Sequence, residues 1–132
     1  MAVNVLVVDD STVMRSMIIK TLRLSGIQLG DIHQAANGRE GLDALGQHWI
    51  DLVLADINMP EMNGEDMIDG MLAAPDLKDI PVVVISTEGS RTRIRRLQDK
   101  GVRFIHKPFT PEIIRDTVKE VLGNGVFDAT AA

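Results

Sequence analysis

Short apolar runs alternate along this chain with longer segments in which apolar residues recur every three or four positions. The first run is Val3–Val8, and the segment behind it carries Val13, Met14, Met17, Ile18 and Leu22. A run of this length predicts a buried strand, and the spacing behind it predicts an amphipathic helix. Ser11 is a suitable N-cap for that helix, and Gly26 is a suitable end.

The same pattern recurs four more times. The expected strands cover residues 32–36, 51–55, 82–85 and 102–106, and the expected helices begin near Gly38, after Asn63-Gly64, near residue 90 and at Pro111. The polar character of the 32–36 strand predicts a position at the edge of a sheet. Pro60 makes continuation of the third strand unfavourable.

Five strand–helix units predict an α/β fold, namely a doubly wound (βα)5 parallel five-stranded sheet covered on both faces by right-handed crossover helices. The 132 residues match the size of one domain. We expect this domain to span residues 1–125 and to be followed by a short C-terminal tail, 126–132, with no output domain.

Composition narrows the class of function. The net charge of −5, from 14 basic and 19 acidic residues, disfavours direct DNA binding, which needs a positive surface. The chain has no cysteine, its start lacks a secretory signal, and its apolar runs are too short to cross a membrane. We therefore expect a cytoplasmic protein whose partners are other proteins.

Polar residues stand where the expected strands end. They are Asp9 and Asp10, Asp56, Ser86 and Thr87, and Lys107. In a parallel sheet these ends share one edge, and ligands bind there at the point where the winding reverses. Taken singly, each motif also suits a helix cap or a turn, but their convergence on one edge favours a functional site.

If the first and third strands are neighbours, Asp9, Asp10 and Asp56 meet, and each like-charged pair costs about 4 kcal/mol at roughly 4 Å in an effective dielectric near 20. A hard divalent cation neutralises such a cluster best, and its oxygen ligands favour Mg²⁺. With the cation bound, Asp56 becomes a nucleophile for phosphoryl transfer, assisted by Lys107 and a hydroxyl group.

Four motifs occur together. They are Asp9-Asp10-Ser11, Asp56-Ile57-Asn58-Met59-Pro60 with Gly64, a hydroxyl residue that ends the fourth strand, and Lys107-Pro108-Phe109. Over residues 3–122 this set resembles the receiver domains of two-component response regulators, specifically the stand-alone, CheY-like chemotaxis type. The resemblance implies a flavodoxin-like sheet with strand order 2-1-3-4-5. It also implies phosphorylation by a sensor histidine kinase or a small phosphodonor, as part of a phosphorelay.

The same resemblance implies roles for the residues of the cluster. Asp10, Asp56 and the backbone carbonyl of Asn58 would hold Mg²⁺, for which Mn²⁺ can substitute, and Asp9 would contribute through water. Asp56 would be the phosphoacceptor, and Lys107 would pair with the phosphoryl group. Such a domain catalyses only its own phosphorylation and dephosphorylation, so we expect a switch and not a turnover enzyme.

The resemblance also implies how the switch works. Ser86 would donate a hydrogen bond to the phosphoryl group, Phe104 would turn inward, and the surface of the fourth helix, fifth strand and fifth helix would change its affinity for a downstream protein, such as a flagellar motor component or another signalling protein. Phe104 replaces the family's usual Tyr, so contacts through a phenolic hydroxyl are excluded. Thr87 replaces a smaller residue, so we expect restricted access to the site. We expect a monomer, with phosphorylation-dependent dimerisation left open.

Two rival functions share parts of this pattern. A phosphohydrolase with an aspartate nucleophile would need Asp-x-Asp-x-Thr, and Asn58 occupies the position of the second acid. A flavodoxin-like cofactor binder would need a hydroxyl-rich loop after the first strand. The basic cluster of Arg91, Arg93, Arg95 and Arg96 suits either a docking surface or a solvated helix face. We interpret Trp49 as a packing residue.

Overall fold

The computed structural model describes residues 2–123, which form strands and helices in strict alternation. The strands are β1 (Val3–Val8), β2 (Leu29–Ala35), β3 (Leu52–Ala55), β4 (Val82–Ser86) and β5 (Arg103–His106). The helices are α1 (Thr12–Leu24), α2 (Gly38–Gln47), α3 (Gly64–Ala73), α4 (Arg91–Asp99) and α5 (Pro111–Leu122). The expected tail at 126–132 lies outside the described residues.

The strands form one parallel sheet in the order β2-β1-β3-β4-β5, which confirms the predicted fold and the edge position of β2. Val8, the last residue of β1, pairs with Ala35 of β2 and with Ala55 of β3. The three strands therefore end at the same level. Residues that follow β1 and β3 are therefore side by side at the C-terminal ends of the strands.

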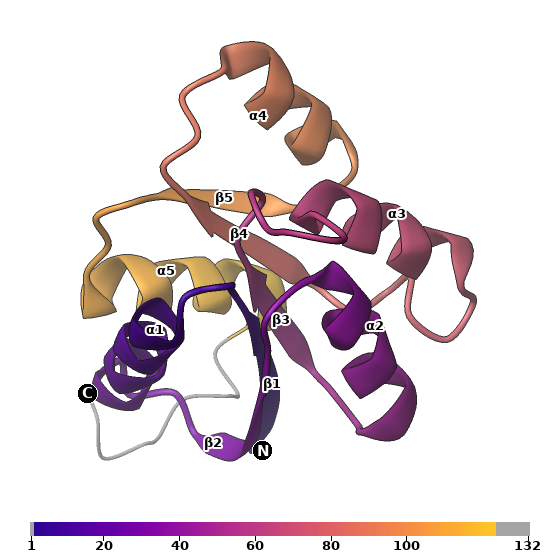
Figure 1. Cartoon of the computed structure of the whole chain (residues 1–132). Coiled ribbons are helices and arrows are strands. Elements are labelled where there is room, and N and C mark those ends of the chain that lie inside the picture. The colour runs from indigo at the N-terminus through magenta and orange to yellow at the C-terminus, as the bar shows by residue number, and fades with distance from the viewer. Residues whose placement is uncertain (1, 124–132) are drawn as a thin grey trace.

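Helices cover both faces of the sheet. Figure 1 shows α1 beside α5 on one side and α2 beside α3 on the other. Along β1, Val5 and Val7 point into the core under α1 and α5, whereas Leu6 and Val8 point into the core under α2 and α3. Successive side chains of a strand alternate between faces, so a strand covered on both sides is apolar throughout.

Side-chain caps begin every described helix. The cap residues are Ser11, Asn37, Asn63, Ser90 and Thr110, and the side chain of each accepts a hydrogen bond from a backbone N–H of the first turn. The predictions of Ser11 as a cap and of Pro111 in the first turn of a helix are confirmed. Short polar residues thus fix the point at which each β–α loop ends and its helix begins, at the C-terminal ends of the strands, where the functional residues lie.

Three apolar residues lie in a different environment from the one predicted. Val13 and Met17 of α1 are 71% and 52% exposed, because this helix packs onto the sheet through Ile18 and Leu22 instead. Trp49 is 79% exposed, and its indole N–H donates to Asp51. The interpretation of Trp49 as a packing residue was therefore wrong.

Among the helices within residues 2–123, none has the length and hydropathy needed to span a bilayer.

Candidate functional site

Three carboxylates converge at the ends of β1 and β3. Asp9, Asp10 and Asp56 each place one oxygen within 4.8 Å of the others. The level ends of the two strands cause this convergence, and the backbone N–H of Asp56 donates to the carbonyl of Val8 at 2.9 Å. Asp9 is buried, Asp56 is partly covered and Asp10 is exposed, so the cluster opens to solvent on the Asp10 side.

Asp9 has the least favourable environment of the three for a negative charge. Its side chain is only 2% exposed, and burial raises the pKa of Asp9. The N–H of Ser11, 2.9 Å from Asp9 Oδ1, and the Lys107 ammonium work in the opposite direction, while the Asp56 carboxylate raises the pKa further. The balance leaves the charged form of Asp9 disfavoured, a situation that a bound cation would reverse.

Lys107 extends across the cluster from the end of β5. Its ammonium nitrogen lies 3.5 Å from Asp9 Oδ2 and 3.6 Å from Asp56 Oδ2, and the side chain is 14% exposed. The backbone N–H of Lys107 donates to the carbonyl of Ser86, which fixes the start of the loop. One ammonium cannot balance three carboxylates, so the site retains negative charge. Its oxygen donors suit a hard divalent cation, and the cluster can hold a metal ion.

The loop after β3 folds back closely on Asp56. Asp56 Oδ1 accepts a hydrogen bond from the N–H of Ile57 at 2.7 Å, and the N–H of Gly64 donates to the carbonyl of Ile57 at 2.8 Å. A Cβ atom at Gly64 would collide with the backbone carbonyl oxygen of Asp56. Gly64, which the sequence motif contains, therefore permits the turn that presents the Asp56 carboxylate.

The predicted switch residues differ in their surroundings. Ser86 is fully buried, and its hydroxyl oxygen accepts from the N–H of Glu88 at 3.1 Å. Thr87 is exposed at the rim of the site. Phe104 is half-buried against the core under α2 and α3, and its ring centroid lies 5.8 Å from that of His106. Ser86 and Lys107 are adjacent through the backbone, whereas Phe104 lies within β5, two residues before the end of that strand.

Two arginines near the site had no predicted role there. Arg15, one turn beyond the Ser11 cap, donates to the backbone carbonyl of Asp9, a position that its spacing from the cap could have indicated. Arg93 donates from a single nitrogen to Asn58 Oδ1 at 3.0 Å and to Glu88 Oε1 at 2.7 Å. In the sequence, Arg93 stood out only as a member of the basic cluster, which did not indicate a contact with Asn58 or Glu88.

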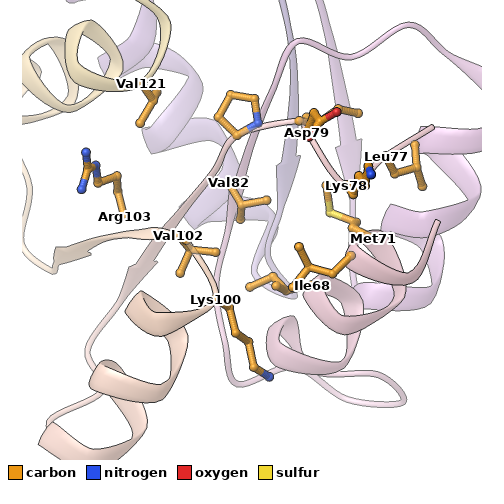
Figure 2. A pocket seen from close by; sticks show the side chains of 14 residues that line it. Ile68, Met71, Leu77, Lys78, Asp79, Val82, Lys100, Val102, Arg103 and Val121 are labelled. Atoms are coloured by element: carbon orange, nitrogen blue, oxygen red, sulfur yellow. The ribbon is translucent and has the colours of Figure 1, made fainter. Parts of the chain in front are cut away.

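A cavity of about 420 Å³ lies far from the carboxylates. Pro81 and Val82 line it where β4 begins, and Val102 lines it just before β5. Figure 2 shows Ile68 and Met71 of α3 on another of its walls. Parallel strands begin at one edge of the sheet and end at the other, so this cavity and the carboxylate cluster occupy opposite edges.

The chain belongs to the response regulator receiver domain family, whose sequence profile matches residues 5–119. A relative named chemotaxis protein CheY homolog, from Campylobacter jejuni, is 35% identical over 130 residues, which cover 97% of this chain and 98% of the relative. The range that the family profile matches contains both carboxylate motifs and Lys107. The family resemblance inferred from the motifs is thereby confirmed.

Solved structures agree with this assignment. Chemotaxis protein CheY4 of Vibrio cholerae is 31% identical and superposes with a TM-score of 0.80, covering 92% of this chain and 100% of that chain. CheY in the CheX-CheY-BeF3-Mg²⁺ complex of Borrelia burgdorferi is 29% identical, with a TM-score of 0.81 and coverage of 90% of this chain and 88% of that chain. The fold and the family are therefore the same in all three proteins.

Proposed function

We propose that this chain is a response regulator receiver domain that is switched by Mg²⁺-dependent phosphorylation of Asp56. The observation that carries the proposal is the convergence of Asp9, Asp10 and Asp56 within 4.8 Å beside one lysine. Asp10, Asp56 and the Asn58 backbone carbonyl are the proposed metal ligands, with Asp9 acting through water. Mg²⁺ or Mn²⁺, when bound, would shield the charge of an incoming phosphoryl group.

In the proposed reaction, a carboxylate oxygen of Asp56 attacks phosphorus and forms a P–O bond. The bond from phosphorus to the donor breaks, a P–N bond for a phosphohistidine or a P–O bond for acetyl phosphate, and the donor keeps the electron pair. Lys107, whose ammonium lies 3.6 Å from Asp56 Oδ2, would pair with phosphoryl oxygens. Asp56 Oδ1 accepts a hydrogen bond from the N–H of Ile57, a contact that would orient the nucleophile.

The switch then follows from the added charge. Phosphorylation brings about 1.5 to 2 negative charges and new acceptor oxygens to the site. We infer that Ser86 donates a hydrogen bond to this group, that the loop from Ser86 to Gly89 rearranges, and that Phe104 changes its packing. Thr87, exposed at the rim, would restrict access to the phosphoryl group. The domain would act on no other substrate, so it would be a switch and not a turnover enzyme.

Proteins are the proposed partners. A sensor histidine kinase would supply the phosphoryl group, and a downstream protein would bind the surface formed by α4, β5 and α5. The Borrelia relative is seen with CheX, beryllofluoride and Mg²⁺, and the Campylobacter relative is named for chemotaxis. These relatives support a role in chemotaxis or in related phosphorelay signalling.

Intact-mass measurement after incubation with acetyl phosphate and Mg²⁺ tests the proposal. We expect one added phosphoryl group on the native protein and on Asp43→Asn, a control that removes an exposed carboxylate from α2. Asp56→Asn should gain none. Phosphorylation of Asp56→Asn to the same extent would refute the assignment of the acceptor. Steady hydrolysis of phosphate esters would instead favour the rival phosphohydrolase.

A further inference from the structure

Arg93 joins the two loops on either side of the acceptor. Its Nη1 lies 3.0 Å from Oδ1 of Asn58 in the β3–α3 loop and 2.7 Å from Oε1 of Glu88 in the β4–α4 loop. The side chains of Arg93 and Glu88 are 24% and 19% exposed, so water only partly screens their ion pair. One guanidinium nitrogen therefore spans the gap between two segments that the sequence separates by 30 residues or so.

Both ends of this bridge lead to the site. Asn58 lies two residues after Asp56, and its backbone carbonyl is itself the proposed metal ligand in this loop. Glu88 lies two residues after Ser86, and its N–H donates to the Ser86 hydroxyl oxygen at 3.1 Å. Glu88 Oε2 also accepts from the N–H of Gly89 at 3.1 Å. The position of Glu88 and the position of the Ser86 hydroxyl are thus linked by direct contacts.

We propose that Arg93 is a positioning residue that latches the β4–α4 loop to the β3–α3 loop and opposes the rearrangement that follows phosphorylation. This inference rests on the proposed function. A hydrogen bond is lost beyond about 3.5 Å, so a relative separation of the two loops by roughly 1.5 Å breaks at least one of the two contacts. Removal of Arg93 therefore makes the rearranged loop easier to reach.

Neighbouring basic residues make different contacts. Arg96 of α4 and Lys100, which caps the end of α4, pair with Glu65 of α3 at 2.6 and 3.5 Å, and so tie α4 to a neighbouring helix and not to the site. Arg91 is exposed, and within residues 2–123 its side chain has no recorded ion pair or hydrogen bond. Arg91→Ala removes the same charge from the same helix as Arg93→Ala, and it is the matched control.

Titration with beryllofluoride at saturating Mg²⁺, followed by calorimetry, tests the latch. We expect Arg93→Ala to bind the phosphoryl mimic about fivefold more tightly than the native protein, since a partly exposed ion pair of this kind is lost on rearrangement. Arg91→Ala should stay within about twofold of the native affinity. Glu88→Gln should also bind more tightly, and the double variant should gain less than the product of the two single effects.

A gain in affinity separates a latch from a merely structural role, because a weakened fold would lower the affinity. Equal affinities of Arg93→Ala and Arg91→Ala would overturn the inference, and so would weaker binding by Arg93→Ala, which would show that the guanidinium assists phosphorylation. Failure of the native protein to bind beryllofluoride with Mg²⁺ would contradict the proposed function itself. The native titration therefore distinguishes the two failures.

Discussion

Asp9→Asn removes a charge from the carboxylate cluster while keeping the shape of the side chain. The carboxylate oxygens lie within 4.8 Å of one another, so each repulsion that Asp9 experiences, from Asp10 and from Asp56, amounts to about 3.5 kcal/mol or more in an effective dielectric near 20. The attraction to Lys107 at 3.5 Å amounts to about 4.7 kcal/mol on the same basis. The repulsions exceed the attraction by about 2 kcal/mol, and burial of the charged group adds to the imbalance.

We therefore expect Asp9→Asn to stabilise the metal-free protein. Because Asp10 is exposed and its share is screened, the gain should be about 1–2 kcal/mol, or roughly 3–8 °C in Tm. The Asn side chain can still accept from the N–H of Ser11, so that contact is retained. Urea and thermal unfolding in EDTA measure the gain, and Asp43→Asn should stay within about 0.5 kcal/mol of the native protein.

Addition of Mg²⁺ should reduce or reverse the difference in stability between Asp9→Asn and the native protein. A ligand that binds only the folded state stabilises it in proportion to its affinity, and the native cluster has the greater charge with which to bind the cation. An Asp9→Asn protein that is less stable than the native protein in EDTA would refute the reasoning. It would show that the ion pair with Lys107 outweighs the repulsion between the carboxylates.

Two more outcomes follow from the geometry of the site. Because burial raises the pKa of Asp9, the folded chain binds the proton of the Asp9 carboxyl group more tightly than the unfolded chain does. The native protein should therefore gain stability relative to Asp9→Asn as the pH falls through the folded-state pKa of Asp9. Urea unfolding at pH 7 and pH 4 measures this change, and the same difference in stability at both pH values would contradict the prediction. Gly64→Ala, whose new Cβ meets the Asp56 carbonyl oxygen, should cost about 1–3 kcal/mol and slow phosphorylation by acetyl phosphate. Gly46→Ala in α2, where nothing lies within 4 Å, should instead stabilise by about 0.5 kcal/mol, and equal stabilities of the two variants would count against the close approach.

The convergence of the carboxylates could be predicted because it depends on topology alone. Once β1 and β3 are neighbouring parallel strands, the residues after Val8 and Ala55 must meet at one edge. The sequence does not distinguish Asp9 from Asp10 so readily. Which of the two is buried depends on the direction in which the backbone leaves β1, and the N–H of Asp9 still donates to the carbonyl of Ala35 in β2 at 3.0 Å.

Side-chain contacts between distant segments could not be predicted. Arg93 lies 35 residues after Asn58, and only the assembled loops bring the two together. The exposure of Val13 and Met17 was missed for a related reason. Helix α1 carries more apolar residues than one buried stripe requires, and periodicity does not say which stripe faces the sheet.

Anomalous diffraction from crystals grown with Mn²⁺ is the decisive measurement for a metal site at Asp9, Asp10 and Asp56, because it locates the cation without reference to activity. We expect one strong peak in contact with the carboxylates of Asp10 and Asp56, close to Asp9. Well-ordered crystals with the cluster exposed to solvent and no peak there, at a Mn²⁺ concentration that stabilises the protein in solution, would contradict it.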